Sequence, residues 1–199
     1  MNPADNTHSN QNQAKSLGNI GIVGHQGVGK DMVSNYIVDH FQYQHVSTSD
    51  FIREYIAKHN LGTPTRDLMR EIGNKLRAEH GGDYLVRLAF EKSPDNTVVS
   101  GMRAIEEVES FKSKGGIVIG VTAPIELRYK WTQGRGRAGD GVTLEEFKRH
   151  EMHEADSQSA KTQNINAVMS MADYVITNDG SVRHLHAKIA DIIAIIREK

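Results

Sequence analysis

Residues 19–31 read NIGIVGHQGVGKD, and the interpretation of the whole chain starts from them. Residues 20–23 are a short apolar run typical of a buried strand, and residues 24–31 fit the pattern G-x-x-x-x-G-K followed by an acid. Apolar residues then recur every three to four positions from 33 to 41, which predicts one face of a helix. A strand, a glycine loop, a lysine and a helix in this order favour a phosphate-binding loop over a chance glycine-rich turn.

The glycines of this loop allow main-chain N–H groups to approach an anion, because no Cβ stands in the way. These N–H groups and the positive end of the following helix would hold the β-phosphate of a nucleotide. Lys30 would reach the β- and γ-phosphate oxygens as a point charge and so act in catalysis. We expect the nucleotide to contact Gly24, Gln26, Gly27, Val28, Gly29, Lys30, Asp31 and Met32.

The residue after this lysine is Asp31, where the pattern usually has a serine or threonine whose hydroxyl binds Mg²⁺. A carboxylate can also hold Mg²⁺, since this ion prefers oxygen ligands and keeps several waters. We therefore expect a magnesium ion between the carboxylate of Asp31 and the phosphates.

The chain has 199 residues, which suits one α/β domain with its own core. The net charge is −1 and there is no long basic run, so the composition argues against a nucleic-acid partner. There is no cysteine, which excludes disulfides and thiolate metal sites. The ten histidines are interpreted as surface residues, because no carboxylate completes a metal-ligand spacing with them.

Residues 1–18 are rich in Asn, Gln and Ser and almost free of large apolar side chains, which predicts a disordered polar tail. They have neither the apolar core of a signal peptide nor the arginines of a transit peptide, and no other stretch approaches a membrane span. We expect a cytoplasmic protein without a membrane partner, present as a monomer or a homodimer.

Strand and helix patterns alternate along residues 19–199, which predicts a single α/β domain with a parallel sheet covered on both faces. The strands are expected at 20–23, 45–50, 97–99, 117–121 and 174–176. A helix should begin at Asp50, and a capping box at 143–146 should open another.

Ligands of parallel sheets bind beyond the carboxyl ends of the strands, which brings Asp50, Arg103 and the turn at 178–180 to the edge that carries the glycine loop. Arg103 follows a buried strand through a glycine, where a rigid scaffold could aim it at a substrate phosphate. Arg53 and Arg77 also fall near predicted element ends on this edge. The alternatives are an exposed helix charge for Arg53 and, for Arg77, a helix-surface residue paired with Glu71 or Glu79, which we favour.

Residues 134–141 read GRGRAGDG, a basic glycine loop, and we group Arg128 with its arginines. Phosphoryl transfer spreads negative charge over the transferred group, and guanidinium groups grip phosphate bidentately. A basic loop with glycine hinges could close over the phosphates and exclude water. The alternative is a solvent-exposed loop with ordinary surface arginines. Given the phosphate loop, we favour a lid at about 134–141 in which Arg135 and Arg137 act in catalysis.

Six blocks of the sequence together resemble one family: GIVGHQGVGKD, SDFIRE, LRAEHGGDYL, VVSGMRAIEEVESF, the RGRAGD loop and ADYVITNDG. In this order they are similar to archaeal-type dephospho-CoA kinase-like and adenylate-kinase-like proteins, which are P-loop kinases of the nucleoside-monophosphate-kinase group. The similarity covers about residues 19–197.

The resemblance implies a three-layer P-loop NTPase fold with a five-stranded parallel sheet, ATP and Mg²⁺ as the donor, and a nucleotide or nucleotide-like acceptor. It implies that helices at about 50–92 bind the acceptor. It also implies the following roles: Asp50 and Arg53 in the acceptor region, Arg103 near the transferring phosphate, Arg135 and Arg137 in the lid, and Asn178 to Gly180 beside the adenine.

Related members tend to carry an acid after the strand of the fourth block, where this chain has Ser100. One metal position has therefore gained a carboxylate, at Asp31, and the other has lost one. Our hypothesis is that Asp31 and Ser100 hold Mg²⁺ with their chemical types exchanged. The alternative is a weakened metal site in a slow or inactive kinase.

The sequence thus favours an ATP-dependent kinase that transfers the γ-phosphoryl group to a nucleoside monophosphate or to dephospho-CoA. A P-loop NTPase or nucleotide-binding regulatory protein without a small-molecule acceptor is the first alternative, which a water-excluding lid disfavours. A folded protein that binds nucleotide without turnover is the second.

Overall fold

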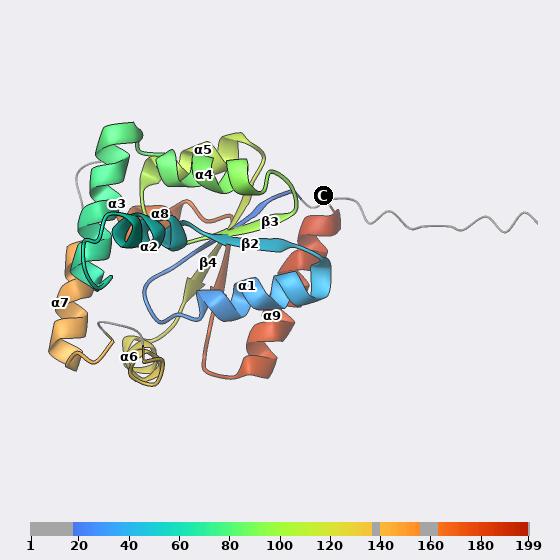
Figure 1. Cartoon of the computed structure of the whole chain (residues 1–199). Coiled ribbons are helices and arrows are strands. Elements are labelled where there is room, and N and C mark those ends of the chain that lie inside the picture. The colour runs from blue at the N-terminus through green and yellow to red at the C-terminus, as the bar shows by residue number, and fades with distance from the viewer. Residues whose placement is uncertain (1–17, 137–139, 156–162, 199) are drawn as a thin grey trace, which may run out of the picture.

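The computed structural model describes residues 18–136, 140–155 and 163–198. Within these ranges the strands are β1 (Ile20–Val23), β2 (Gln44–Ser47), β3 (Thr97–Ser100), β4 (Ile117–Thr122) and β5 (Tyr174–Thr177). They form a five-stranded sheet in the order β2-β3-β1-β4-β5, and every neighbouring pair is parallel (Figure 1). The expected five-stranded parallel sheet is confirmed.

The helices of the described ranges connect the strands or follow them in the sequence. They are α1 (Lys30–Phe41), α2 (Thr48–Lys58), α3 (Arg66–His80), α4 (Tyr84–Lys92), α5 (Ile105–Ser113), α6 (Ile125–Gln133), α7 (Leu144–Ala155), α8 (Ile165–Ser170) and α9 (Val182–Glu198). Figure 1 shows α1 and α9 on one face of the sheet and α4, α5 and α8 on the other, which gives the three-layer α/β arrangement.

Two apolar clusters hold these layers together, because both faces of the central strands are buried. Ile20 and Ile22 of β1 pack toward α1 and α9, whereas Val23 belongs to the cluster beneath α4, α5 and α8. A Cβ on Gly21, between these residues, would lie 2.5 Å from Cε of Met102, so a larger residue there would require the Met102 side chain to shift. Burial on both faces explains why the strand reads as an uninterrupted apolar run.

A third apolar cluster joins α2, α3 and α4 to one another. It contains Ile52, Ile56, Ile72, Leu76 and Leu85, all of which are buried. The amphipathic spacing of these helices therefore serves a local core of their own, beside the carboxyl edge of the sheet.

The helix boundaries differ from the sequence prediction at two places. Helix α2 begins at Thr48 rather than at Asp50, after Ser47 in extended conformation. Helix α8 was not predicted; Asn164 opens it, with its Oδ1 accepting from the N–H of Ala167 at 3.0 Å. The expected capping box is confirmed, since the Thr143 hydroxyl accepts from the N–H of Glu146 at 3.2 Å.

None of the helices in the described ranges is both long and apolar enough to cross a membrane. Residues 1–17 of the predicted tail lie outside those ranges.

Candidate active site

A cavity of about 990 Å³ opens at the carboxyl edge of the sheet. Its volume is at the upper end of the range of small-molecule sites. Thirteen of the residues predicted for the site line it: Gln26, Gly27, Gly29, Lys30, Asp31, Met32, Asp50, Arg53, Ser100, Arg103, Arg135, Asn178 and Gly180. The cavity therefore runs from the glycine loop to the segments expected to bind the acceptor.

The glycine loop has a geometry that only glycine allows. Gly29, immediately before α1, has a φ of +92°, in the left-handed region that side chains disfavour. Gly27 has a φ of +75°, and a Cβ there would lie 2.7 Å from the carbonyl oxygen of Arg128. The loop therefore packs directly against the main chain of α6 at Arg128.

Lys30 is the first residue of α1, and its ammonium group turns back over the loop. Its Nζ donates to the carbonyl oxygen of Gly24 at 2.8 Å and to that of His25 at 2.7 Å. In this arrangement the lysine fixes the start of the loop while remaining on the cavity wall.

Gly24 and Val28, two of the predicted site residues, pack the loop against β4 and the turn after β5. A Cβ on Gly24 would lie 2.4 Å from the carbonyl oxygen of Val121, so the chain passes close to β4 there. The side chain of Val28 is completely buried, and its carbonyl oxygen accepts from Nδ2 of Asn178 at 3.0 Å. Oδ1 of Asn178 accepts from the N–H of Gly180 at 3.1 Å, so this buried amide joins the turn after β5 to the loop.

The two predicted metal-binding side chains both reach the cavity. The hydroxyl of Ser100 lies 2.8 Å from Nε2 of His45, a residue near the start of β2 that lines the cavity and was not predicted from the sequence. Burial lowers the pKa of His45, against the opposing charges of Asp31 and Asp50, and so favours a neutral ring. In the tautomer protonated at Nδ1, Nε2 accepts the hydroxyl proton and leaves the oxygen lone pairs of Ser100 available.

These donors fit Mg²⁺ held mainly by phosphates. The described residues contain no group of three or more histidine and acidic side chains that could hold a metal. Mg²⁺ commonly takes only one or two protein oxygens and completes its shell with water and substrate phosphates. The carboxylate of Asp31 and the hydroxyl of Ser100 match that donor set.

The part of the cavity wall that lies outside the glycine loop is rich in arginine. Arg53 donates to Asp50 at 2.6 Å, and both side chains lie on this wall. Arg66 and Arg70, from the first turns of α3, line it as well, together with Arg103 after β3. Arginines from three separate segments therefore face one space, which suits an anionic ligand.

The interpretation of Arg77 as a surface residue is wrong. Its side chain is 1% exposed, and its Nε donates to Oε1 of Glu107 at 2.9 Å. The other oxygen of Glu107 accepts from the N–H groups of Arg103 and Ala104 at 2.6 and 3.0 Å. One buried carboxylate thus connects α3, the start of α5 and the segment that carries Arg103.

The lid region has one arginine within the described residues. Nε and Nη2 of Arg135 donate to the two oxygens of Asp140, at 2.9 and 2.8 Å, and Gln26 donates to the same carboxylate at 3.3 Å. Asp140 therefore joins Arg135, the described arginine of the predicted lid, to the glycine loop. Arg137, the other predicted lid residue, lies outside the described ranges.

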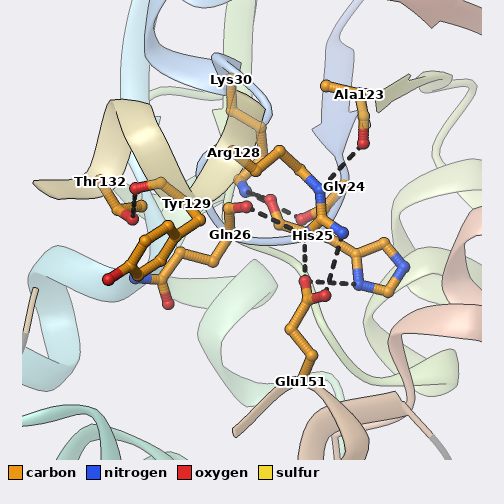
Figure 2. Close-up of polar contacts among 9 residues, drawn as sticks. All are labelled: Gly24, His25, Gln26, Lys30, Ala123, Arg128, Tyr129, Thr132 and Glu151. Atoms are coloured by element: carbon orange, nitrogen blue, oxygen red, sulfur yellow. Dashed lines mark hydrogen bonds and ion pairs between the residues drawn. The ribbon is translucent and has the colours of Figure 1, made fainter. Parts of the chain in front are cut away.

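The grouping of Arg128 with the lid arginines is also wrong, since only 7% of this residue is exposed. Figure 2 shows its guanidinium between the glycine loop and Glu151 of α7. It forms a two-pronged ion pair with Glu151, in which Nη2 and Oε2 are 2.9 Å apart. The positive charge of Arg128 is therefore paired with a carboxylate in the interior of the protein.

Comparison with known proteins places this geometry in context. Residues 23–148 match the family described as "AAA domain". A "UPF0200 protein" of Thermococcus gammatolerans is 29% identical over 186 residues, which cover 86% of this chain and 92% of that protein. A "UPF0200 protein" of Staphylothermus marinus is 28% identical over 182 residues, covering 89% and 92%.

Solved structures show the same fold. Shikimate kinase from Acinetobacter baumannii in complex with shikimate has a TM-score of 0.59 at 20% identity, and the match covers 92% of this chain and 96% of that one. A gluconokinase from Sinorhizobium meliloti has a TM-score of 0.55 at 14% identity, with 92% and 94% covered. At such identities the likeness establishes a P-loop kinase-like fold.

Proposed function

This chain belongs to the AAA domain family, and the match begins at residue 23, so it includes the whole glycine loop; we propose that the protein is an ATP-dependent phosphotransferase. The proposed acceptor is a small nucleotide-type molecule, such as a nucleoside monophosphate or dephospho-CoA. The observation that carries the proposal is that one cavity is lined both by Lys30 with the glycine loop and by several arginines. An NTPase needs room only for water, whereas this cavity has a second charged region.

The proposed donor site is the glycine loop with α1. Main-chain N–H groups of the loop and the ammonium of Lys30 would hold the β- and γ-phosphates, since a helix start with exposed N–H groups is a natural anion site. Asp31 and Ser100 would hold Mg²⁺, which supplies charge neutralisation between the phosphates. Asn178 and Gly180 would border the adenine through the turn after β5.

The proposed transfer relies on positioned positive charge. In phosphoryl transfer the protein mainly orients the reactants and stabilises the charge on the equatorial oxygens. Arg103 would lie near the transferring phosphate, and Arg135 would reach the phosphates after leaving Asp140; Arg137 is proposed as a second lid arginine. Asp50 and Arg53 would orient the acceptor.

A panel assay tests this function. ATP and Mg²⁺ are offered with each nucleoside monophosphate and with dephospho-CoA, and ADP release is followed. We expect ADP formation that depends on one acceptor class. ADP released at the same rate without any acceptor would instead identify an NTPase, and nucleotide binding without ADP release would identify a protein without turnover.

The metal hypothesis gives a separate prediction. Replacing Asp31 with serine is expected to lower transfer by about 100-fold, because the metal loses its charged oxygen ligand. Adding Ser100→Asp should restore part of the loss, and the Mg²⁺ concentration needed for half-maximal ATP binding should follow the same order. Asp39→Ser, an exposed position of the same helix, is the control. A double variant no better than Asp31→Ser would refute the exchange.

A further inference from the structure

Three consecutive carbonyl groups of the glycine loop accept hydrogen bonds from cations. Lys30 serves those of Gly24 and His25, and Nη1 of Arg128 donates to that of Gln26 at 3.3 Å (Figure 2). In a planar trans peptide the C=O and the following N–H point in opposite directions. Arg128 does not line the cavity, so its hold on the Gln26 carbonyl from behind the loop directs the next N–H group, that of Gly27, toward the cavity, as a bound phosphate requires.

Nucleotide binding requires Lys30 to leave its present partners, whereas Arg128 can keep its own. The ammonium of Lys30 lies on the cavity wall and must leave its two carbonyl partners to reach a phosphate. Arg128 is 7% exposed and lies behind the loop, outside the wall of the cavity. Its contact with Gln26 can therefore persist while the lysine moves, which leaves one cation holding the loop throughout.

Arg128 is itself fixed by two further segments, the residue after β4 and helix α7. Its Nε donates at 2.9 Å to the carbonyl oxygen of Ala123, which follows β4, and its two terminal nitrogens bind Glu151 of α7. Glu151 also lies 3.4 Å from Nδ1 of His25 in the loop. Burial raises the pKa of Glu151, but hydrogen bonds and charges from His25 and Arg128 outweigh it and lower the pKa to about 2. The carboxylate is therefore charged at neutral pH.

We propose that Arg128 and Glu151 are positioning residues that hold the phosphate loop in its nucleotide-binding conformation and couple it to α6 and α7, the two helices that flank the lid. The inference rests on the proposed function, since it assumes that the loop binds a nucleotide. The competing interpretation is a buried ion pair that stabilises the fold and has no effect on the loop.

The two interpretations predict different behaviour when the pair is replaced rather than broken. Apolar side chains of similar volume commonly substitute for a buried ion pair without loss of stability. The double variant Arg128→Met, Glu151→Leu should therefore unfold near the wild-type temperature. We nevertheless expect it to bind ADP about 10-fold or more weakly, because the Gln26 carbonyl has lost its donor and the loop its orientation.

The experiment measures ADP affinity by calorimetry and the melting temperature of each protein. Arg128→Lys is the milder second variant, since it keeps the charge beside Glu151 but not the forked contacts to Gln26 and Ala123; we expect the same weakening of ADP binding. Glu145→Gln is the matched control, because Glu145 is 83% exposed on the same helix as Glu151. It should leave both quantities unchanged.

The outcomes separate cleanly. Wild-type ADP affinity in Arg128→Lys, or in a folded double variant, would overturn the positioning role and leave a purely structural pair. A wild-type protein that binds no ADP would overturn the proposed function itself.

Discussion

Replacing Lys30 with methionine is expected to reduce ATP-dependent phosphoryl transfer by about 100-fold or more, the usual cost of removing one preorganised charged donor. The structure places the ammonium 2.8 Å from the carbonyl oxygen of Gly24, at the start of α1 and on the cavity wall. Methionine retains the length of the side chain but carries no charge to hold a phosphate. The rate of ADP release in the presence of an acceptor measures the effect.

Nucleotide affinity can be followed in the same protein. Trp131 is the single tryptophan of the chain and lines the cavity, so its fluorescence should change when a nucleotide enters. Lys58→Met, at an exposed position near the end of α2, is the control and should behave as the wild type. Unchanged ATP affinity in Lys30→Met would show that the glycine loop does not bind the nucleotide.

Replacing Glu107 with alanine is expected to lower the free energy of unfolding by about 3–5 kcal/mol, the cost of leaving a buried charge without its partner. Arg77 would remain buried and uncompensated, and the N–H groups of Arg103 and Ala104 would lose their acceptor. For a domain of this size the loss corresponds to a fall of about 10 °C in the melting temperature. Chemical denaturation measures the free energy directly.

The control for this prediction is Glu109→Ala, two positions along the same helix, where the side chain is exposed. Its effect should stay within about 0.5 kcal/mol. A similarly small loss for Glu107→Ala would show that the ion pair with Arg77 contributes little to the fold.

Most of the fold was predictable because its signals are local. The run at 20–23 and the glycine loop after it indicated a strand entering a helix, and alternating strand and helix patterns indicated a covered parallel sheet. Helix α8 escaped prediction because it is a single short segment, although Asn164 before it is a typical helix cap. The end of β2 and the start of α2 were misplaced because several residues from 47 to 50 are suitable caps.

The two buried arginines could not be identified from local pattern. Arg77 and Arg128 have the spacing of ordinary surface residues. Arg77 pairs with Glu107, 30 positions away on another helix, and Arg128 pairs with Glu151, 23 positions away on another helix. Such a pairing depends on how the helices pack, which neither composition nor periodicity reports. His45 was missed for a similar reason, since its contact with Ser100 exists only because β2 and β3 are neighbours.

The Arg77–Glu107 pair lies at one end of α3, and the arginines of this helix that face the cavity lie at the other end. The pair fastens the last turn of α3 to α5, whereas Arg66 and Arg70 stand at the other end and face the cavity. At 1.5 Å per residue, Arg66 lies about 16 Å from this fixed point. A rotation of about 10° around the pivot would carry Arg66 nearly 3 Å, by about 1.5 Å of travel for each 5° of turn. If α3 turned about this end, a small angular change at the buried pair would become a larger displacement of the guanidinium groups at the other end.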